Sequence, residues 1–280
     1  MQRVCVFVDG ENFRHSIVDL CKGEFDPTDY LPKNAQWEAF FDSLVNQIEF
    51  RIFYGDSLSD RLSVHRLRTY WYVVQHVDFK PYKIPKPRDE SEEFIKVIRL
   101  DKGTRTELDS TGRTPTPEAL DRIYKRLTAR KQNFLHRFDG WQFVQNGISE
   151  KHKSIEFRRA GSISYNLFQE ELGKEKSVDV KLAVDMVTLK DIYDTAILVS
   201  GDQDYVPAVQ AVKDAGKRVV NVAFRTRDGK MLPGGARRLN QMTDSTIELR
   251  YESLKRLLQI QSFPSGEPST PEPPCPTTKP

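Results

Sequence analysis

The chain has 280 residues, of which 38% are hydrophobic and 30% charged, a composition that fits a soluble globular protein and excludes a disordered one. Its formal net charge of +3 gives no compositional reason to expect nucleic-acid binding, so a basic surface has to come from local clustering. Three scattered cysteines exclude a disulfide framework and a zinc site, and they indicate a reducing cytoplasm. The sequence offers no membrane span, and its first residues do not read as a signal peptide.

Short apolar runs alternate with helical patterns in the first 84 residues and again after residue 174. Strands are expected at Val4–Val8, Phe50–Tyr54, Phe79–Ile84, Ala196–Val199 and Val219–Phe224. Helices are expected at Phe13–Leu20, Gln36–Gln47, Ser59–Gln75, Val178–Leu189 and Val206–Ala215. Strands that alternate with helices pair in parallel through right-handed crossovers, so the predicted fold class is α/β with a doubly wound parallel sheet flanked by helices.

The alternation stops between about residues 85 and 173. Apolar positions from Leu120 to Phe138 predict one long amphipathic helix, and the other face of this helix is basic. The segments Ser154–Arg159 and Ser162–Phe168 predict a hairpin about Gly161. We interpret this region as an inserted helix plus hairpin.

One domain is therefore expected over residues 1–258, with the insertion at about 85–173 inside it. Residues 259–280 hold seven of the sixteen prolines and few apolar residues, so they predict a disordered tail. A proline-rich tail can also bind a protein partner.

Two of the expected strands end in acidic turns. Asp9 follows the first strand, and Asp202 and Asp204 follow Ala196–Val199. Loops at the carboxyl ends of parallel strands line the ligand crevice of an open sheet, so these carboxylates are expected to meet there. Each acid alone could cap a helix, but capping needs one acid per helix and explains the pair poorly.

A further acid, Asp179, lies at the start of the helix before the second of these strands. Carboxylates that converge repel each other unless a cation neutralises them. Oxygen ligands suit Mg²⁺ or Mn²⁺, and such a site can activate water and stabilise charge on a phosphodiester. The predicted metal and catalytic site therefore consists of Asp9, Asp179, Asp202 and Asp204.

Three stretches, VCVFVDGENF, KSVDVKLAVDMV and AILVSGDQDYVPAVQAVKDAGKRVVNVAF, resemble in this order the NYN domain of the PIN-like nuclease superfamily, in its LabA-like branch. The later ARRLNQMTDSTIEL resembles the closing helix and strand of that family. The resemblance covers about residues 1–83 and 174–250. It implies a PIN-like, Rossmannoid fold and a metal-dependent endoribonuclease whose acidic site contains the same four aspartates.

The resemblance also implies that Asn12 is a polar substrate contact and that Asp185 is a further member of the metal site. RNA, in single-stranded form, is the implied partner, and the oligomeric state, monomer or homodimer, is left open. Cations that could hold the RNA backbone lie near the acids along the chain: Lys176, Lys181, Arg225, Arg227, Arg237 and Arg238. Each of these also fits an ordinary solvated surface.

Two features of the long helix also fit either nucleic-acid binding or an ordinary structural role. Its basic face between Arg122 and Arg137 fits either a nucleic-acid surface or a solvated helix. Trp141 and Phe143 fit either base stacking or core packing.

Three other classes of protein share some of these features. A phosphatase of the haloacid dehalogenase type needs a second Asp two residues after Asp9, where Glu11 stands. A Toprim-type domain pairs its Asp-x-Asp with a Glu on an earlier strand. A non-catalytic RNA-binding or scaffolding module on the same fold remains the alternative, and it predicts RNA binding without metal and without cleavage.

Overall fold

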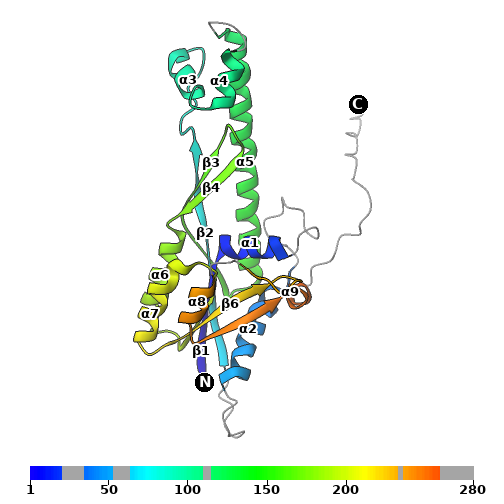
Figure 1. Ribbon diagram of the computed structural model, residues 1–280, viewed down its shortest axis with the longest axis vertical. Coiled ribbons are helices and arrows are strands. Elements are labelled where there is room, and N and C mark those ends of the chain that lie inside the picture. The colour runs from blue at the N-terminus through cyan, green and yellow to red at the C-terminus, as the bar shows by residue number, and fades with distance from the viewer. Residues whose placement is uncertain (21–34, 53–63, 110–114, 233–235, 259–280) are drawn as a thin grey trace, which may run out of the picture.

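The computed structural model describes residues 1–20, 35–52, 64–109, 115–232 and 236–258. A mixed eight-stranded sheet forms its centre, in the order β4-β3-β2-β1-β5-β6-β7, with β8 beside β6 (Figure 1). The strands are β1 (Gln2–Asp9), β2 (Val64–Lys80), β3 (Ile155–Asn166), β4 (Glu171–Lys176), β5 (Thr195–Val199), β6 (Arg218–Arg225), β7 (Met231–Leu232) and β8 (Ser245–Arg250). All neighbours pair in parallel except β4 with β3 and β7 with β6. The α/β fold class is thus confirmed, with a mixed sheet in place of a purely parallel one. The predicted tail, 259–280, lies outside the described residues.

Helices cover both faces of the sheet. One face carries α1 (Gly10–Leu20), α2 (Trp37–Ile52) and α9 (Tyr251–Leu258). The other carries α6 (Val178–Thr188), α7 (Val206–Asp214) and α8 (Ala236–Met242), with the short 3₁₀ turn η1 (Gln203–Tyr205) before α7. No helix within the described ranges is long and apolar enough to cross a membrane.

Strand β1 shows why both faces need a helix layer. Its side chains alternate, so that Val4, Val6 and Val8 pack against the first helix layer while Cys5 and Phe7 pack against the second. All five side chains are fully buried. A strand buried on both faces is continuously apolar, which is the pattern that predicted it from the sequence.

Trp71 on β2 is the centre of an aromatic cluster below the first helix layer. Its ring centroid lies 5.0 Å from Trp37, 5.4 Å from Phe13, 5.6 Å from Phe41 and 5.0 Å from Phe157. These partners come from α2, α1 and β3, so the cluster joins three segments that are far apart in the sequence.

The strands β2 and β3 extend beyond the last residue of β1. Asp9 pairs with Tyr72, whereas β2 continues to Lys80, which pairs with Asn166 on β3. We call residues 74–109, 115–143 and 160–176 the arm, which contains α3 (Ser91–Ile98), α4 (Lys102–Asp109) and most of α5 (Pro117–Lys151). Figure 1 shows the arm projecting from the layered part of the molecule, with α5 alongside the strands.

The arm has an apolar core of its own, in which the helices pack on the extended strands: Phe79, Phe94, Ile98, Leu108, Leu120, Ile123, Leu127, Phe134, Phe138, Tyr165 and Leu167. The predicted amphipathic helix is therefore confirmed within α5, and its apolar stripe faces this core.

The predicted helix Ser59–Gln75 is wrong, because residues from Val64 onward form β2 and the residues before it lie outside the described ranges. β2 is a central strand whose residues 69–73 are buried on both faces. Such a run of aromatic and β-branched residues shows no period of two, so its spacing imitates a helical stripe.

The two neighbouring strand predictions also need correction. Residues 50–52 of the predicted strand Phe50–Tyr54 end helix α2, and the last two lie outside the described residues. Of the predicted strand Phe79–Ile84, only the first two residues are the end of β2. Pro81 has no N–H to donate to a neighbouring strand, which is consistent with β2 ending there.

The predicted hairpin about Gly161 is wrong, since β3 runs straight through this residue and turns back only before β4. Gly161 has a φ of 60°, and a Cβ atom there would overlap the carbonyl oxygen of Lys176. Glycine is needed here because the end of β4 approaches the backbone of β3, and a turn plays no part.

We predict that Gly161→Ala lowers the free energy of unfolding by about 1–3 kcal/mol, because a left-handed φ is strained for alanine and the new Cβ would displace β4. Gly140→Ala is the control, since nothing lies within 4 Å of a Cβ at this position on α5. It should raise stability by roughly 0.5–1 kcal/mol through helix propensity. Urea unfolding followed by circular dichroism measures both, and a neutral Gly161→Ala would contradict the packing described.

Candidate active site

Asp9, the last residue of β1, is a buried carboxylate held by three donors. Its side chain accepts hydrogen bonds from the backbone N–H of Asn12 (3.1 Å), the hydroxyl of Ser200 (3.0 Å) and the hydroxyl of Tyr205 (3.1 Å). Burial still raises the pKa of Asp9 to about 6, and the charge of Asp202 adds to the rise. The hydrogen bonds therefore compensate only part of the cost of burying this charge.

The loop after β5 is joined to the loop after β1. The amide oxygen of Asn12 accepts a hydrogen bond from the N–H of Gly201 at 3.0 Å, and the hydroxyl of Ser200 accepts one from the N–H of Asp202 at 3.1 Å. Ser200 thus connects Asp9 to Asp202. Asn12, predicted as a substrate contact, fixes the two loops relative to each other.

Asp202 and Asp204 have different surroundings. Asp202 is half-buried, and its Oδ1 caps η1 by accepting a hydrogen bond from the N–H of Asp204 at 2.9 Å. The side chain of Asp204 is exposed. The capping role of the first acid and the functional role predicted for it are compatible, because capping uses one of its two oxygens.

Asp179, in the first turn of α6, acts electrostatically on the same groups as Asp9. Its charge contributes to raising the pKa of Tyr205 and of Glu175, and the charge of Asp9 acts on both groups as well. Three of the four predicted aspartates, namely Asp9, Asp179 and Asp202, are therefore brought together. Asp204 has the exposed position described above.

Glu175 on β4 also interacts electrostatically with these acids, and the sequence analysis missed it. Burial, together with the charges of Asp9, Glu11 and Asp179, raises its pKa to about 8. It lines a small pocket with Glu11 and with Trp141 and Gln145 of α5. The sequence offered no sign of Glu175 because β4 was not predicted. Only the pairing of β4 with β3 places this side chain near the acids.

Glu11 carries a charge that is already balanced. Burial tends to raise its pKa, but hydrogen bonds from His15 and Arg14 outweigh this and lower the pKa to about 2. Glu11 is therefore ionised over the whole physiological range, and its negative charge adds to the repulsion felt by Glu175.

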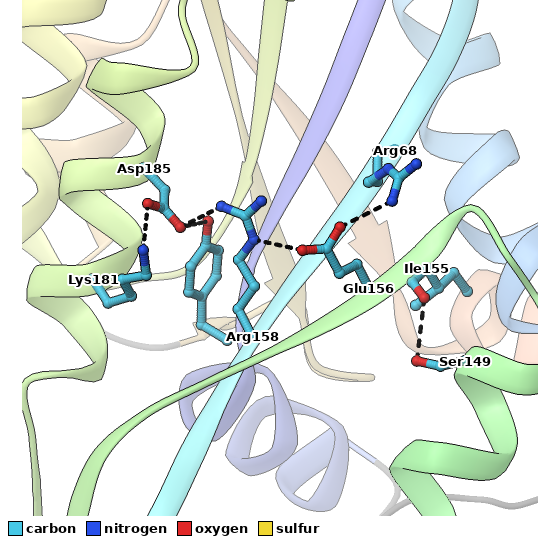
Figure 2. A network of polar contacts seen from close by, with 8 residues as sticks. Arg68, Ser149, Ile155, Glu156, Arg158, Lys181 and Asp185 are labelled. Atoms are coloured by element: carbon cyan, nitrogen blue, oxygen red, sulfur yellow. Dashed lines mark hydrogen bonds and ion pairs between the residues drawn. The ribbon is translucent and has the colours of Figure 1, made fainter.

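Asp185, predicted as a further metal ligand, lies in a network of its own (Figure 2). It accepts hydrogen bonds from Lys181 Nζ at 2.8 Å, from Arg158 Nη1 at 2.5 Å and from the hydroxyl of Tyr72 at 3.0 Å. Burial tends to raise its pKa, but these donors outweigh it and lower the pKa. Two cations therefore balance this carboxylate without a metal.

Arg158 anchors this network to the sheet. Its Nε donates to Glu156, which also pairs with Arg68 at 3.0 Å, and its guanidinium lies 4.0 Å from the ring centroid of Tyr70. The network joins α6 to β2 and β3. It holds against the sheet the helix that carries Asp179 in its first turn.

Three of the six predicted RNA-binding cations have the following partners within the fold. Lys181 pairs with Asp185, and Arg225 forms two 2.7 Å bonds to Glu248. The guanidinium of Arg227 lies 3.9 Å from the ring centroid of Tyr251. All of the candidates except Arg225 are exposed, namely Lys176, Lys181, Arg227, Arg237 and Arg238.

The basic face of α5 is likewise used inside the arm. Arg126 pairs with Glu107, Arg130 pairs with Glu170, and Lys131 lies over the ring of Phe79. These contacts favour the structural interpretation of this face. Of the two aromatic residues considered for stacking, Trp141 packs against the core of the arm and Phe143 is exposed.

The arrangement places clustered carboxylate oxygens at the carboxyl ends of β1 and β5, the chemistry that hard cations such as Mg²⁺ prefer. Among the described residues, no three His, Cys, Asp or Glu side chains form a ready-made metal site. The carboxylate oxygens could still coordinate a cation, and a bound cation would reduce the repulsion between the carboxylates.

These features place the protein among α/β proteins with an acidic site at the carboxyl ends of parallel strands. The family model of the NYN domain matches residues 118–245, which supports an NYN domain protein as the motifs predicted. The match includes the second and third motifs and begins within the predicted insertion. NYN domains belong to the PIN-like nuclease superfamily, whose members generally use divalent metals. Its place in the LabA-like branch stays a prediction.

No curated protein matches the chain. A crystal structure of a protein of unknown function from Vibrio parahaemolyticus aligns with 89% of this chain and 93% of its own, with 14% identity and a TM-score of 0.39. At this TM-score the likeness does not define a common fold.

We predict that Glu175→Gln stabilises the protein increasingly between pH 4.5 and pH 8. In this window the folded chain holds a proton on Glu175 that the unfolded chain releases, so wild-type stability falls as pH rises, whereas glutamine does not titrate. The gain should reach roughly 1–2 kcal/mol, after allowance for solvent screening.

Urea unfolding at pH 5, 7 and 9 measures this difference. Glu171→Gln, on the exposed start of the same strand, is the matched control and should give no pH-dependent gain. A constant difference between Glu175→Gln and the wild type at all three values would contradict the repulsion inferred here.

Proposed function

We propose that this protein is a Mg²⁺- or Mn²⁺-dependent endoribonuclease that hydrolyses phosphodiester bonds of single-stranded RNA in the cytoplasm. The observation that carries the proposal is the carboxylate Asp9, buried at the carboxyl end of β1 and close enough to Asp202 to feel its charge. Among the described residues, no cation pairs with it. The NYN match supports the nuclease class, and the carboxylate cluster supports the dependence on metal.

In this proposal Asp9, Asp179, Asp202 and Asp204 hold the cation. When bound, a divalent cation lowers the pKa of water and stabilises the charge that develops on the phosphate. Asp204 is included because it lies two residues after Asp202, and its backbone N–H donates to the Asp202 carboxylate. Asp185 is left out, since Lys181 and Arg158 already balance its charge.

Other residues keep the carboxylates in place. The hydroxyl groups of Ser200 and Tyr205 donate to the same oxygen, Oδ2, of Asp9, and the N–H of Asn12 donates to the other oxygen. A carboxylate held by three donors is oriented before any ligand arrives. Exposed Lys176, at the end of β4 close to the acids in sequence, is the proposed contact for the phosphate backbone.

We predict that Asp202→Asn abolishes cleavage of a labelled single-stranded RNA in Mn²⁺ or Mg²⁺. The loss should be about 100-fold or more, since even outer-shell changes at metal sites cost roughly 10–100-fold. Asp191→Asn is the matched control, because this exposed aspartate lies before the opposite, amino end of β5. It should cleave like the wild type, and EDTA should stop both.

The alternative, a non-catalytic RNA-binding module, is separated by the same assay. It predicts no cleavage by any variant while RNA stays bound in EDTA. Equal cleavage by Asp202→Asn and the wild type would contradict the site.

A further inference from the structure

The segment Lys80–Arg88, with the sequence KPYKIPKPR, joins β2 to the first helix of the arm. It contains four cations and no acid. Tyr82 in its middle is 88% exposed, which is unusual for so large a ring. We call this segment the basic loop.

The cations of the basic loop face solvent. Lys80, Lys83, Lys86 and Arg88 are all exposed. Lys83 pairs with Glu90 at 2.7 Å and lies 3.9 Å from Glu93, and the N–H of Lys86 donates to the same Glu90. Within the described residues, no acid pairs with Lys80 or Arg88.

Three prolines reduce the freedom of the loop. Pro81, Pro85 and Pro87 each fix their φ angle, so the loop loses little conformational entropy when a ligand orders it. The basic loop therefore presents an exposed ring between solvated cations on a restricted segment of chain. Such a segment is suited to bind single-stranded nucleic acid, because the ring stacks on a base and the cations contact phosphates.

The basic loop lies at a defined distance from the acidic site. Asp9 pairs with Tyr72, and β2 continues for eight more residues to Lys80. At about 3.3 Å per residue this separation is about 26 Å. A single strand with a stacked spacing of about 3.4 Å would need about eight nucleotides to reach from one to the other.

We infer that the basic loop is a second contact for single-stranded RNA, separate from the acidic site. Tyr82 stacks on a base, and Lys80, Lys86 and Arg88 contact the backbone around it. RNA that spans both places is bound more tightly than RNA that reaches only one. The inference rests on the proposed function, because it takes RNA as the ligand of the acidic site.

Binding of labelled six-nucleotide and twenty-nucleotide single-stranded RNAs to the full chain, with Ca²⁺ present as a cation that takes oxygen ligands at the acidic site, tests the inference by fluorescence anisotropy. Tyr82→Ala should weaken binding of the longer RNA about tenfold, within the range for loss of one stacked base, and change binding of the shorter RNA by less than twofold. Leu100→Ala is the control for an exposed apolar side chain on the arm, 82% exposed, and should leave both unchanged. The double variant of Lys80→Ala and Arg88→Ala should reduce the slope of log affinity against log salt by about 1.4.

The outcomes separate this inference from the proposed function. Cleavage by Tyr82→Ala at the wild-type rate, with wild-type affinity for the longer RNA, would overturn the basic loop and leave the nuclease standing. Loss of affinity by Tyr82→Ala in a protein that cleaves nothing in Mn²⁺ would support the basic loop and overturn the nuclease. An equal loss for both RNA lengths, or no binding of the longer RNA by the wild type, would overturn the basic loop.

Discussion

A buried carboxylate that its hydrogen bonds do not fully compensate is the constraint on which the rest of this molecule depends. Asp9 takes three hydrogen bonds, and its pKa still rises to about 6. The charges of Asp9 and Asp179 both help to raise the pKa of Glu175, so the acids of this site repel one another. A fold keeps such an arrangement at a cost in stability, and in the proposed function the binding of a cation recovers that cost.

The unequal lengths of the strands determine where this site lies. β1 ends at Asp9, while β2 and β3 continue into the arm alongside α5 (Figure 1). Two sets of polar contacts hold the segments that carry the acids in place. Asn12 joins the loops after β1 and β5, and Asp185 with Arg158 joins α6 to the sheet.

The sequence predicted what local patterns determine. Strands β1, β5 and β6, helices α1, α2, α6 and α7 and the acids at strand ends follow from apolar runs and from the turns after them. The prediction was wrong at β2, because a strand buried on both faces shows no alternation of apolar and polar residues. It was also wrong at β3, where Gly161 allows close packing of two strands and does not form a turn. Glu175 could not be found, because only long-range pairing of β4 with β3 brings it to the acids. The partners of Lys181 and Arg225 are also tertiary: α6 presents Asp185 to the first, and β8 presents Glu248 to the second.

Binding of Mn²⁺ to the full chain at pH 7.5, measured by isothermal titration calorimetry, tests the central claim that the repulsion around Asp9 exists to hold a cation. The account predicts that the wild type and Asp191→Asn bind Mn²⁺ with equal affinity and that Asp9→Asn binds at least tenfold more weakly, since one of the charges that attract the ion is removed. Asp9→Asn that binds as tightly as the wild type, or a wild type that binds no Mn²⁺, would contradict it.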